Sequence, residues 1–129
     1  NPTSRDPRQW YGAAQEALSS MLQLLTADTI RCHVLVLSHV QLIERSDGTM
    51  KGYATSIGKA FSPQIASFFP TFIMAESKTV GTKTKRTIST APSSMFDLKN
   101  PTPFKMEDSY PLETGMASIF EILTGRETV

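Results

Sequence analysis

Residues 31–41 read Arg-Cys-His-Val-Leu-Val-Leu-Ser-His-Val-Gln and indicate the fold of this chain more strongly than any other stretch. The apolar centre does not alternate with polar residues and is too short for a core helix. Such a run is typical of a strand buried on both faces of a parallel sheet. We therefore expect a buried strand at residues 32–38. Ligands of open α/β sheets bind beyond the carboxyl ends of the strands, so Ser38, His39 and Gln41 either line a site or end the strand in a polar loop.

Length and composition favour one domain, residues 1–129. The chain has 129 residues, of which 40% are hydrophobic, and is long enough for one domain with a core but too short for two. Its longest apolar stretch, near residues 68–75, is broken by Pro70 and is far shorter than a membrane span. The single cysteine, Cys32, excludes an intramolecular disulfide and fits a reducing interior. We therefore expect a cytoplasmic protein that does not enter a membrane.

Apolar periodicity predicts the helices. Apolar residues recur every three or four positions over residues 7–26, where Asp6 is the expected N-cap, and over residues 114–123, where Gly125 is the stop signal. A further helix is expected at residues 57–69.

Turn residues and β-formers predict the rest of the chain. Strands are expected at residues 71–77 and 82–90, joined as a hairpin by residues 79–81. Residues 44–56 carry turn residues without periodicity and are expected to form a long loop. The predicted fold class is therefore α/β, with a mainly parallel sheet that includes residues 32–38, flanking helices, and a C-terminal hairpin and helix.

Basic residues crowd into the predicted hairpin. The net charge of +1 does not indicate nucleic acid, but strand alternation places Lys83 and Lys85 on one face and Arg86 with Ile88 on the other. Two lysines side by side repel each other unless an anion lies over them, and phosphate of a nucleotide or nucleic acid would serve. The alternative is a solvated edge strand whose lysines deter aggregation.

The predicted loop at residues 44–57 combines cations with flat or soft apolar groups. Single-stranded nucleic acid is bound by such combinations on a mobile backbone. The candidate DNA-binding residues are Arg45, Met50, Lys51 and Tyr53.

Other types of site lack their required pattern. Residues 52–60 resemble a phosphate-binding P-loop, but five residues separate Gly52 from Gly58, and Ala60 follows the lysine where a hydroxyl is needed. Cys32, His33 and His39 do not have the spacing of a zinc site, so no metal is expected.

Several motifs, taken in order, resemble the second half of a RecA-type ATPase core. More closely, the chain resembles the carboxyl-terminal part of the phage-encoded, RecA-like ATP-binding proteins of the single-strand-annealing recombination class. The similarity rests on a strand with a polar end, a glycine-lysine-alanine helix, a further strand, a Lys-Arg strand, a Thr-x-Pro turn and a Tyr-Pro-Leu-Glu-Thr-Gly tail, at residues 37–41, 58–61, 71–75, 83–86, 90–92 and 110–115.

The resemblance implies a role for each candidate group. His39 or Gln41 would link the γ-phosphate to the following loop, and residues 44–57 would bind single-stranded DNA. The basic residues would reach a nucleotide across a subunit interface of a homo-oligomer; these are Lys83, Lys85 and Arg86. The phosphate-binding and Walker B motifs normally lie upstream of residue 1. ATP and Mg²⁺ would therefore belong to the intact parent protein, in the bacterial host cytoplasm, and this part alone would not hydrolyse ATP.

Two classes of function remain open from the sequence. In the first, the chain is part of an ATP-dependent protein that acts on single-stranded DNA in recombination or replication. In the second, it is a non-catalytic phage or bacterial α/β domain that binds a protein partner.

Overall fold

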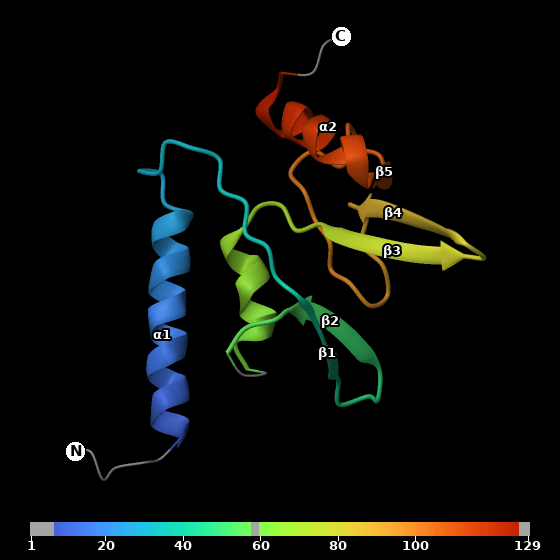
Figure 1. The fold of residues 1–129 in the computed structure, drawn as a ribbon. Coiled ribbons are helices and arrows are strands. Elements are labelled where there is room, and N and C mark those ends of the chain that lie inside the picture. Colours follow the sequence, from blue (N-terminus) through green and yellow to red (C-terminus); the bar gives the residue numbers. More distant parts are fainter. Residues whose placement is uncertain (1–6, 58–59, 127–129) are drawn as a thin grey trace. The chain divides into compact units, whose positions relative to one another are not determined.

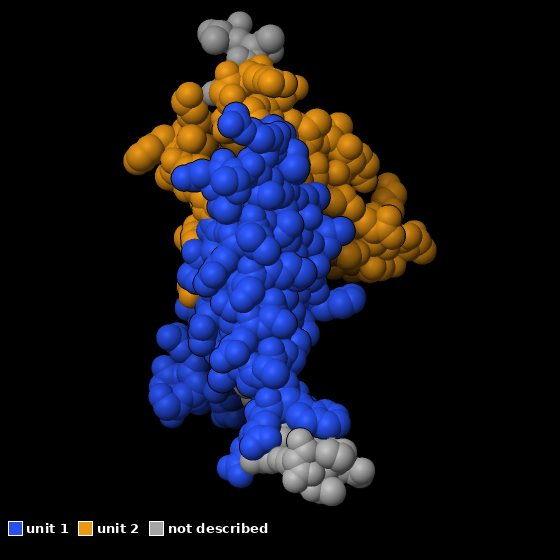
Figure 2. Space-filling model, turned by 90° about the vertical axis from the view of Figure 1, so that its left-hand side faces the viewer, with its two compact units in different colours: residues 1–69 blue, residues 70–129 orange. Residues whose placement is uncertain are grey.

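The computed structural model describes residues 7–57 and 60–126. The chain forms two compact units, residues 1–69 (unit 1) and residues 70–129 (unit 2), coloured separately in Figure 2. The expected N-cap Asp6, and Gly58 and Lys59 of the glycine-lysine-alanine motif, lie outside the described residues.

Unit 1 begins with the long helix α1, Pro7–Leu25, which confirms the predicted helix at 7–26 (Figure 1). Proline is favoured in the first turn of a helix, where its missing N–H has no intrahelical partner in any case. At the other end, the backbone N–H and the hydroxyl of Thr26 both donate to the carbonyl of Leu22, at 3.1 and 2.8 Å. Leu22 is the helix residue buried most deeply.

The predicted strand at residues 32–38 is absent. Residues 33–39 have no regular secondary structure, and most of their apolar side chains are exposed. Strand structure begins only with β1, Val40–Glu44, which pairs antiparallel with β2, Met50–Ala54. The predicted loop at 44–56 is therefore also wrong, because most of it is a hairpin. Gly48, at φ 84°, supplies the left-handed backbone that closes the short turn between these strands.

The expected helix at residues 57–69 is a short 3₁₀ helix, η1, Ser62–Phe68. Pro63 stands in its first turn, which limits how far upstream helical hydrogen bonding extends. Phe61, Ser62 and Ile65 are buried in unit 1. Ser62 donates to the side-chain oxygen of Gln41 at 2.9 Å and so ties η1 to β1.

Unit 2 contains an antiparallel sheet of three strands in the order β3-β4-β5, and one helix (Figure 1). The strands are β3, Met74–Val80, β4, Lys83–Ser89, and β5, Ser109–Pro111. The predicted hairpin is confirmed, with its first strand displaced by three residues. Gly81, at φ 64°, occupies the first position of the two-residue turn, and no residue other than glycine has a positive φ in the described chain. A positive φ at the first turn residue, followed by a negative φ at the second, is typical of a type II′ turn, whose backbone twist matches that of the two strands of a hairpin.

Helix α2, Leu112–Thr124, covers one face of this sheet and confirms the helix predicted at 114–123. Ile119 of the helix and Ile88 of β4 are almost fully buried and form the core with Met106. Gly125 ends the helix in the left-handed conformation, and its N–H and that of Arg126 donate to the last helical carbonyls.

The expected fold class, a partial RecA-like core with a mainly parallel sheet, is wrong. Helices and strands are both present, but both sheets are small and entirely antiparallel. The physical reason lies in the connections, because tight turns at Gly48 and Gly81 join consecutive strands as hairpins, whereas parallel strands require long crossovers. Within residues 7–57 and 60–126, no helix has both the length and the apolar character needed to cross a bilayer.

The contact between α2 and the sheet depends on Gly115. A Cβ at this position would lie 2.8 Å from Cβ of Tyr110 and 3.2 Å from Cδ1 of Ile88. We predict that Gly115→Ala destabilises the protein by about 1–3 kcal/mol, although alanine is the better helix former, because the helix must move away from the sheet. Urea titration followed by circular dichroism measures this change.

Gly12→Ala is the matched control, since a Cβ at Gly12 of α1 meets nothing within 4 Å. It should leave stability unchanged or raise it by up to about 1 kcal/mol. Equal effects of the two substitutions would show that close packing at Gly115 does not matter.

Candidate nucleic-acid interface

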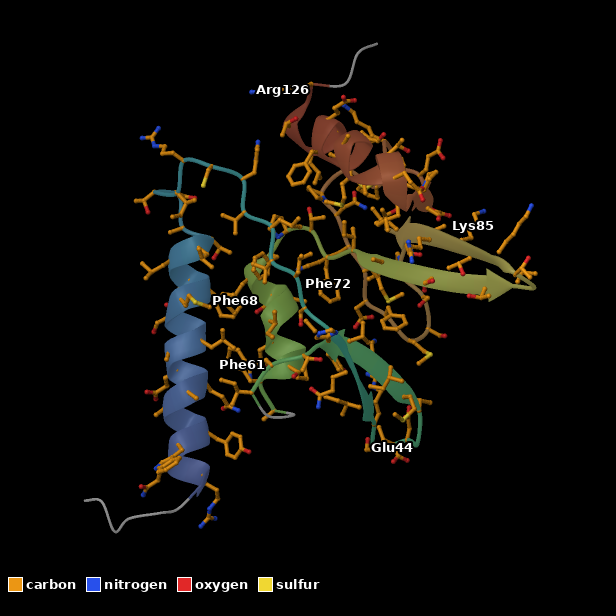
Figure 3. The ribbon with its side chains drawn as sticks, in the orientation of Figure 1. Glu44, Phe61, Phe68, Phe72, Lys85 and Arg126 are labelled. Atoms are coloured by element: carbon orange, nitrogen blue, oxygen red, sulfur yellow. The ribbon has the colours of Figure 1, made fainter. Side chains whose placement is uncertain are left out.

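Three lysines share one face of the β3–β4 hairpin. In the antiparallel register, Lys78 lies directly opposite Lys85, and Val80 lies opposite Lys83. Residues directly opposite each other, and residues two apart on one strand, point to the same face of a sheet. Lys78, Lys83 and Lys85 therefore form one cationic surface, which we call the three-lysine face. Lys85 projects from β4 in Figure 3.

The opposite face of the hairpin has a different composition. Arg86 lies opposite Ser77, and Ile88 on the same face is buried beneath α2. The predicted alternation, with Lys83 and Lys85 on one face and Arg86 on the other, is thus confirmed. The sequence did not pair Lys78 with this group, because its position opposite Lys85 becomes known only from the register of the hairpin.

The three lysine side chains are exposed and uncompensated. Among the described residues, none of them makes a hydrogen bond or an ion pair. The acid on the same face, Glu76, accepts a hydrogen bond from Ser89 at 3.0 Å at the base of the hairpin. Like charges directly opposite each other destabilise a sheet, so an anion placed over Lys78 and Lys85 relieves a repulsion as well as adding an attraction.

The β1–β2 hairpin gathers a second set of predicted residues. Gln41 lies opposite Tyr53, and Lys51 follows two residues away on the same face. The N–H of Thr55 donates to the carbonyl of His39 at 2.8 Å, which continues the ladder and places His39 on that face too. These four residues were predicted as separate phosphate-sensing and DNA-binding groups, and the register brings them together.

The other two predicted residues of this region lie elsewhere. Met50 points to the opposite face, where it is paired with Glu44, the residue labelled at the end of β1 in Figure 3. Arg45 belongs to the turn, where its N–H donates to the carbonyl of Thr49 at 2.7 Å.

Gln41 and His39 do not have the setting on which the phosphate-sensor hypothesis was based. They lie at the start of β1, whereas the hypothesis placed them after the end of a parallel strand. The amide oxygen of Gln41 accepts from Ser62, whose hydroxyl is also 3.1 Å from that of Ser56. This network joins β1 to η1 and gives Gln41 a structural partner.

Unit 2 also has an open cavity of about 320 Å³ beside the end of β4. Its walls come from the irregular segment between β4 and β5 and include Leu98, Met106, Lys99 and Asp108. Across the two described stretches of chain, no group of three or more His, Cys, Asp or Glu side chains is placed to hold a metal ion. The three-lysine face is therefore the most clearly defined candidate site.

Comparison of the chain with protein-family models, curated proteins and solved structures gives no match.

The turn of the first hairpin contains a carboxylate with a shifted pKa. The hydroxyl of Thr49 donates to Oδ1 of Asp47 at 2.6 Å and its backbone N–H donates to the same atom at 3.0 Å. These hydrogen bonds, the side-chain bond first, and the charge of Arg45 lower the pKa of Asp47. A lowered pKa in the folded protein stabilises the turn above the unfolded-state pKa, and this stabilisation is lost as the pH falls through the folded-state pKa.

We predict that Thr49→Val raises the pKa of Asp47 towards its ordinary value, because it removes the larger of the two hydrogen-bond contributions. The pKa is measured by NMR titration of the Asp47 carboxyl. Thr79→Val is a suitable control, since Thr79 pairs its hydroxyl with that of Thr84 in the other hairpin. An Asp47 pKa that stays low in Thr49→Val would assign the shift to another cause.

Proposed function

We propose that this chain binds single-stranded DNA through the three-lysine face, as the DNA-binding part of a recombination or replication protein. The observation that supports the proposal is the presence of Lys78, Lys83 and Lys85 on one exposed face without an anionic partner among the described residues. Cations that contact the phosphate backbone provide most of the affinity for nucleic acid and do not depend on base sequence.

The spacing of the lysines suits an extended polyanion. Lys83 and Lys85 are two residues apart on one strand, which corresponds to roughly 6.7 Å along the strand. Successive phosphates of an extended single strand have a similar separation. A strand of DNA lying along β4 would therefore present one phosphate to each lysine, with Lys78 beside the second of them.

The first hairpin, in unit 1, has by itself the composition of a contact for single-stranded DNA. Tyr53 and Lys51 share one of its faces. Flat or soft apolar groups beside cations allow unpaired bases to stack while the phosphates are neutralised. ATP hydrolysis is not part of the proposal, because the parallel sheet that would place a phosphate sensor at its strand ends is replaced by hairpins.

We predict that replacing each lysine of the three-lysine face by glutamine weakens binding to a fluorescein-labelled oligothymidylate. Each lost phosphate contact should reduce the slope of log affinity against log salt concentration by about 0.7. Fluorescence anisotropy over a series of salt concentrations measures both quantities, and a duplex of equal length tests the preference for a single strand.

Lys99→Gln is the matched control. It removes the same charge from unit 2 at an exposed position, and the backbone bridge between Lys99 and Phe72 does not involve its side chain. Unchanged affinity and salt slope in Lys78→Gln, Lys83→Gln and Lys85→Gln would contradict the proposal. If these variants aggregate while their DNA binding stays unchanged, the lysines protect the open edge of the sheet instead.

A further inference from the structure

The segment from Val34 to Leu37 combines two features that are costly in an isolated chain. Three of its four apolar side chains are exposed, Leu35 at 56%, Val36 at 45% and Leu37 at 85%, whereas Val34 is half-buried. Its backbone N–H and C=O groups also make no backbone hydrogen bonds among the described residues. Successive residues of a β-strand point to opposite sides, so if this segment paired as a strand it would carry apolar side chains on both sides.

Sequence pattern and structure therefore disagree at this segment. A continuous Val-Leu run is typical of a strand that is paired at its edges and covered on both faces. Ser38 and His39 connect the run directly to β1. The β1–β2 ladder ends where the N–H of Thr55, the residue after β2, donates to the carbonyl of His39, so the run leads into β1 from beyond the end of this ladder. An added strand here could pair along the edge of β1 that does not face β2, which has no strand beside it among the described residues.

We infer that this segment pairs antiparallel with the same segment of a second copy of the chain. This inference is independent of the proposed DNA binding. A two-fold axis at Leu35 places Leu35 opposite its own copy and Val34 opposite Val36, so that an apolar residue meets an apolar residue at each central position. Self-complementary surfaces of this type form closed, two-fold dimers, and the two hairpins would join into one four-stranded sheet.

The exposed area favours a weak dimer. The exposed apolar side chains of the segment are only Leu35, Val36 and Leu37, so the area that pairing could bury is small. Standard interfaces bury about 800 Å² per partner, and smaller ones belong to transient complexes. Pairing of the backbone adds hydrogen bonds that the area does not count.

Sedimentation velocity over a concentration series from about 1 μM to 1 mM tests this inference on the whole chain. We expect a reversible monomer–dimer equilibrium that Leu35→Lys weakens at least about tenfold, since it places two ammonium groups against each other at the axis. Leu24→Lys is the matched control. Leu24 is 68% exposed on α1, and its substitution should leave the equilibrium unchanged. A monomer at all concentrations, or a dimer weakened only by Leu24→Lys, would overturn the inference.

Disulfide trapping tests the register. The axis at Leu35 places Cys32, the only cysteine of the chain, opposite residue 38 of the second copy. Directly opposite residues of an antiparallel pair have Cα separations that a disulfide can span. A mixture of the natural chain with Cys32→Ser/Ser38→Cys should cross-link on mild oxidation, and neither protein alone should do so. Cross-linking of the natural chain with itself would indicate parallel, in-register association and would overturn the antiparallel register.

Discussion

The tight turns at Gly48 and Gly81 are the constraint on which the rest of the structure depends. Both glycines hold a positive φ, and each closes a hairpin whose register follows from the length of its turn. Because side chains alternate along a strand, a register fixed by one turn decides which residues share a face over the whole hairpin. A shift by one residue at Gly81 would move Lys83 and Lys85 to the face that α2 covers.

The β3–β4 hairpin is anchored at one end only. Ile88, near the end of β4, is buried against α2, and Tyr110 of β5 lies opposite it. β5 pairs with residues 87–89 of β4 and leaves residues 83–86 without a neighbour on that side among the described residues. The free half of the hairpin contains the three-lysine face. Packing against α2 and β5 therefore restricts which side chains can stand at the base of the hairpin. It does not restrict those near the turn, which can contact a ligand.

The sequence predicted those elements whose signals are local. Helices α1 and α2 follow from apolar periodicity with a proline at one start and a glycine at one stop, and the second hairpin follows from its turn. Residues 32–38 were predicted wrongly because an apolar run indicates that burial is favourable but does not supply the neighbouring strands. β2 was missed because Met50 to Ala54 contain a lysine and a glycine and lack apolar alternation. The alternation of Lys83 and Lys85 was predictable, but the position of Lys78 required the register.

The two units differ in how well their local and tertiary preferences agree. In unit 2, the periodicity of α2, the close approach at Gly115 and the buried Ile88 all support one arrangement. In unit 1, the sequence of residues 34–37 favours a covered strand, and the structure provides neither an edge partner nor a covering layer. Natural sequences are consistent at most positions, and positions that conflict are often functional. The conflict in unit 1 is limited to a short apolar segment without regular structure that leads directly into β1. A second strand at its edge would satisfy the backbone groups of this segment and would bring its apolar side chains into lateral contact with those of the partner strand.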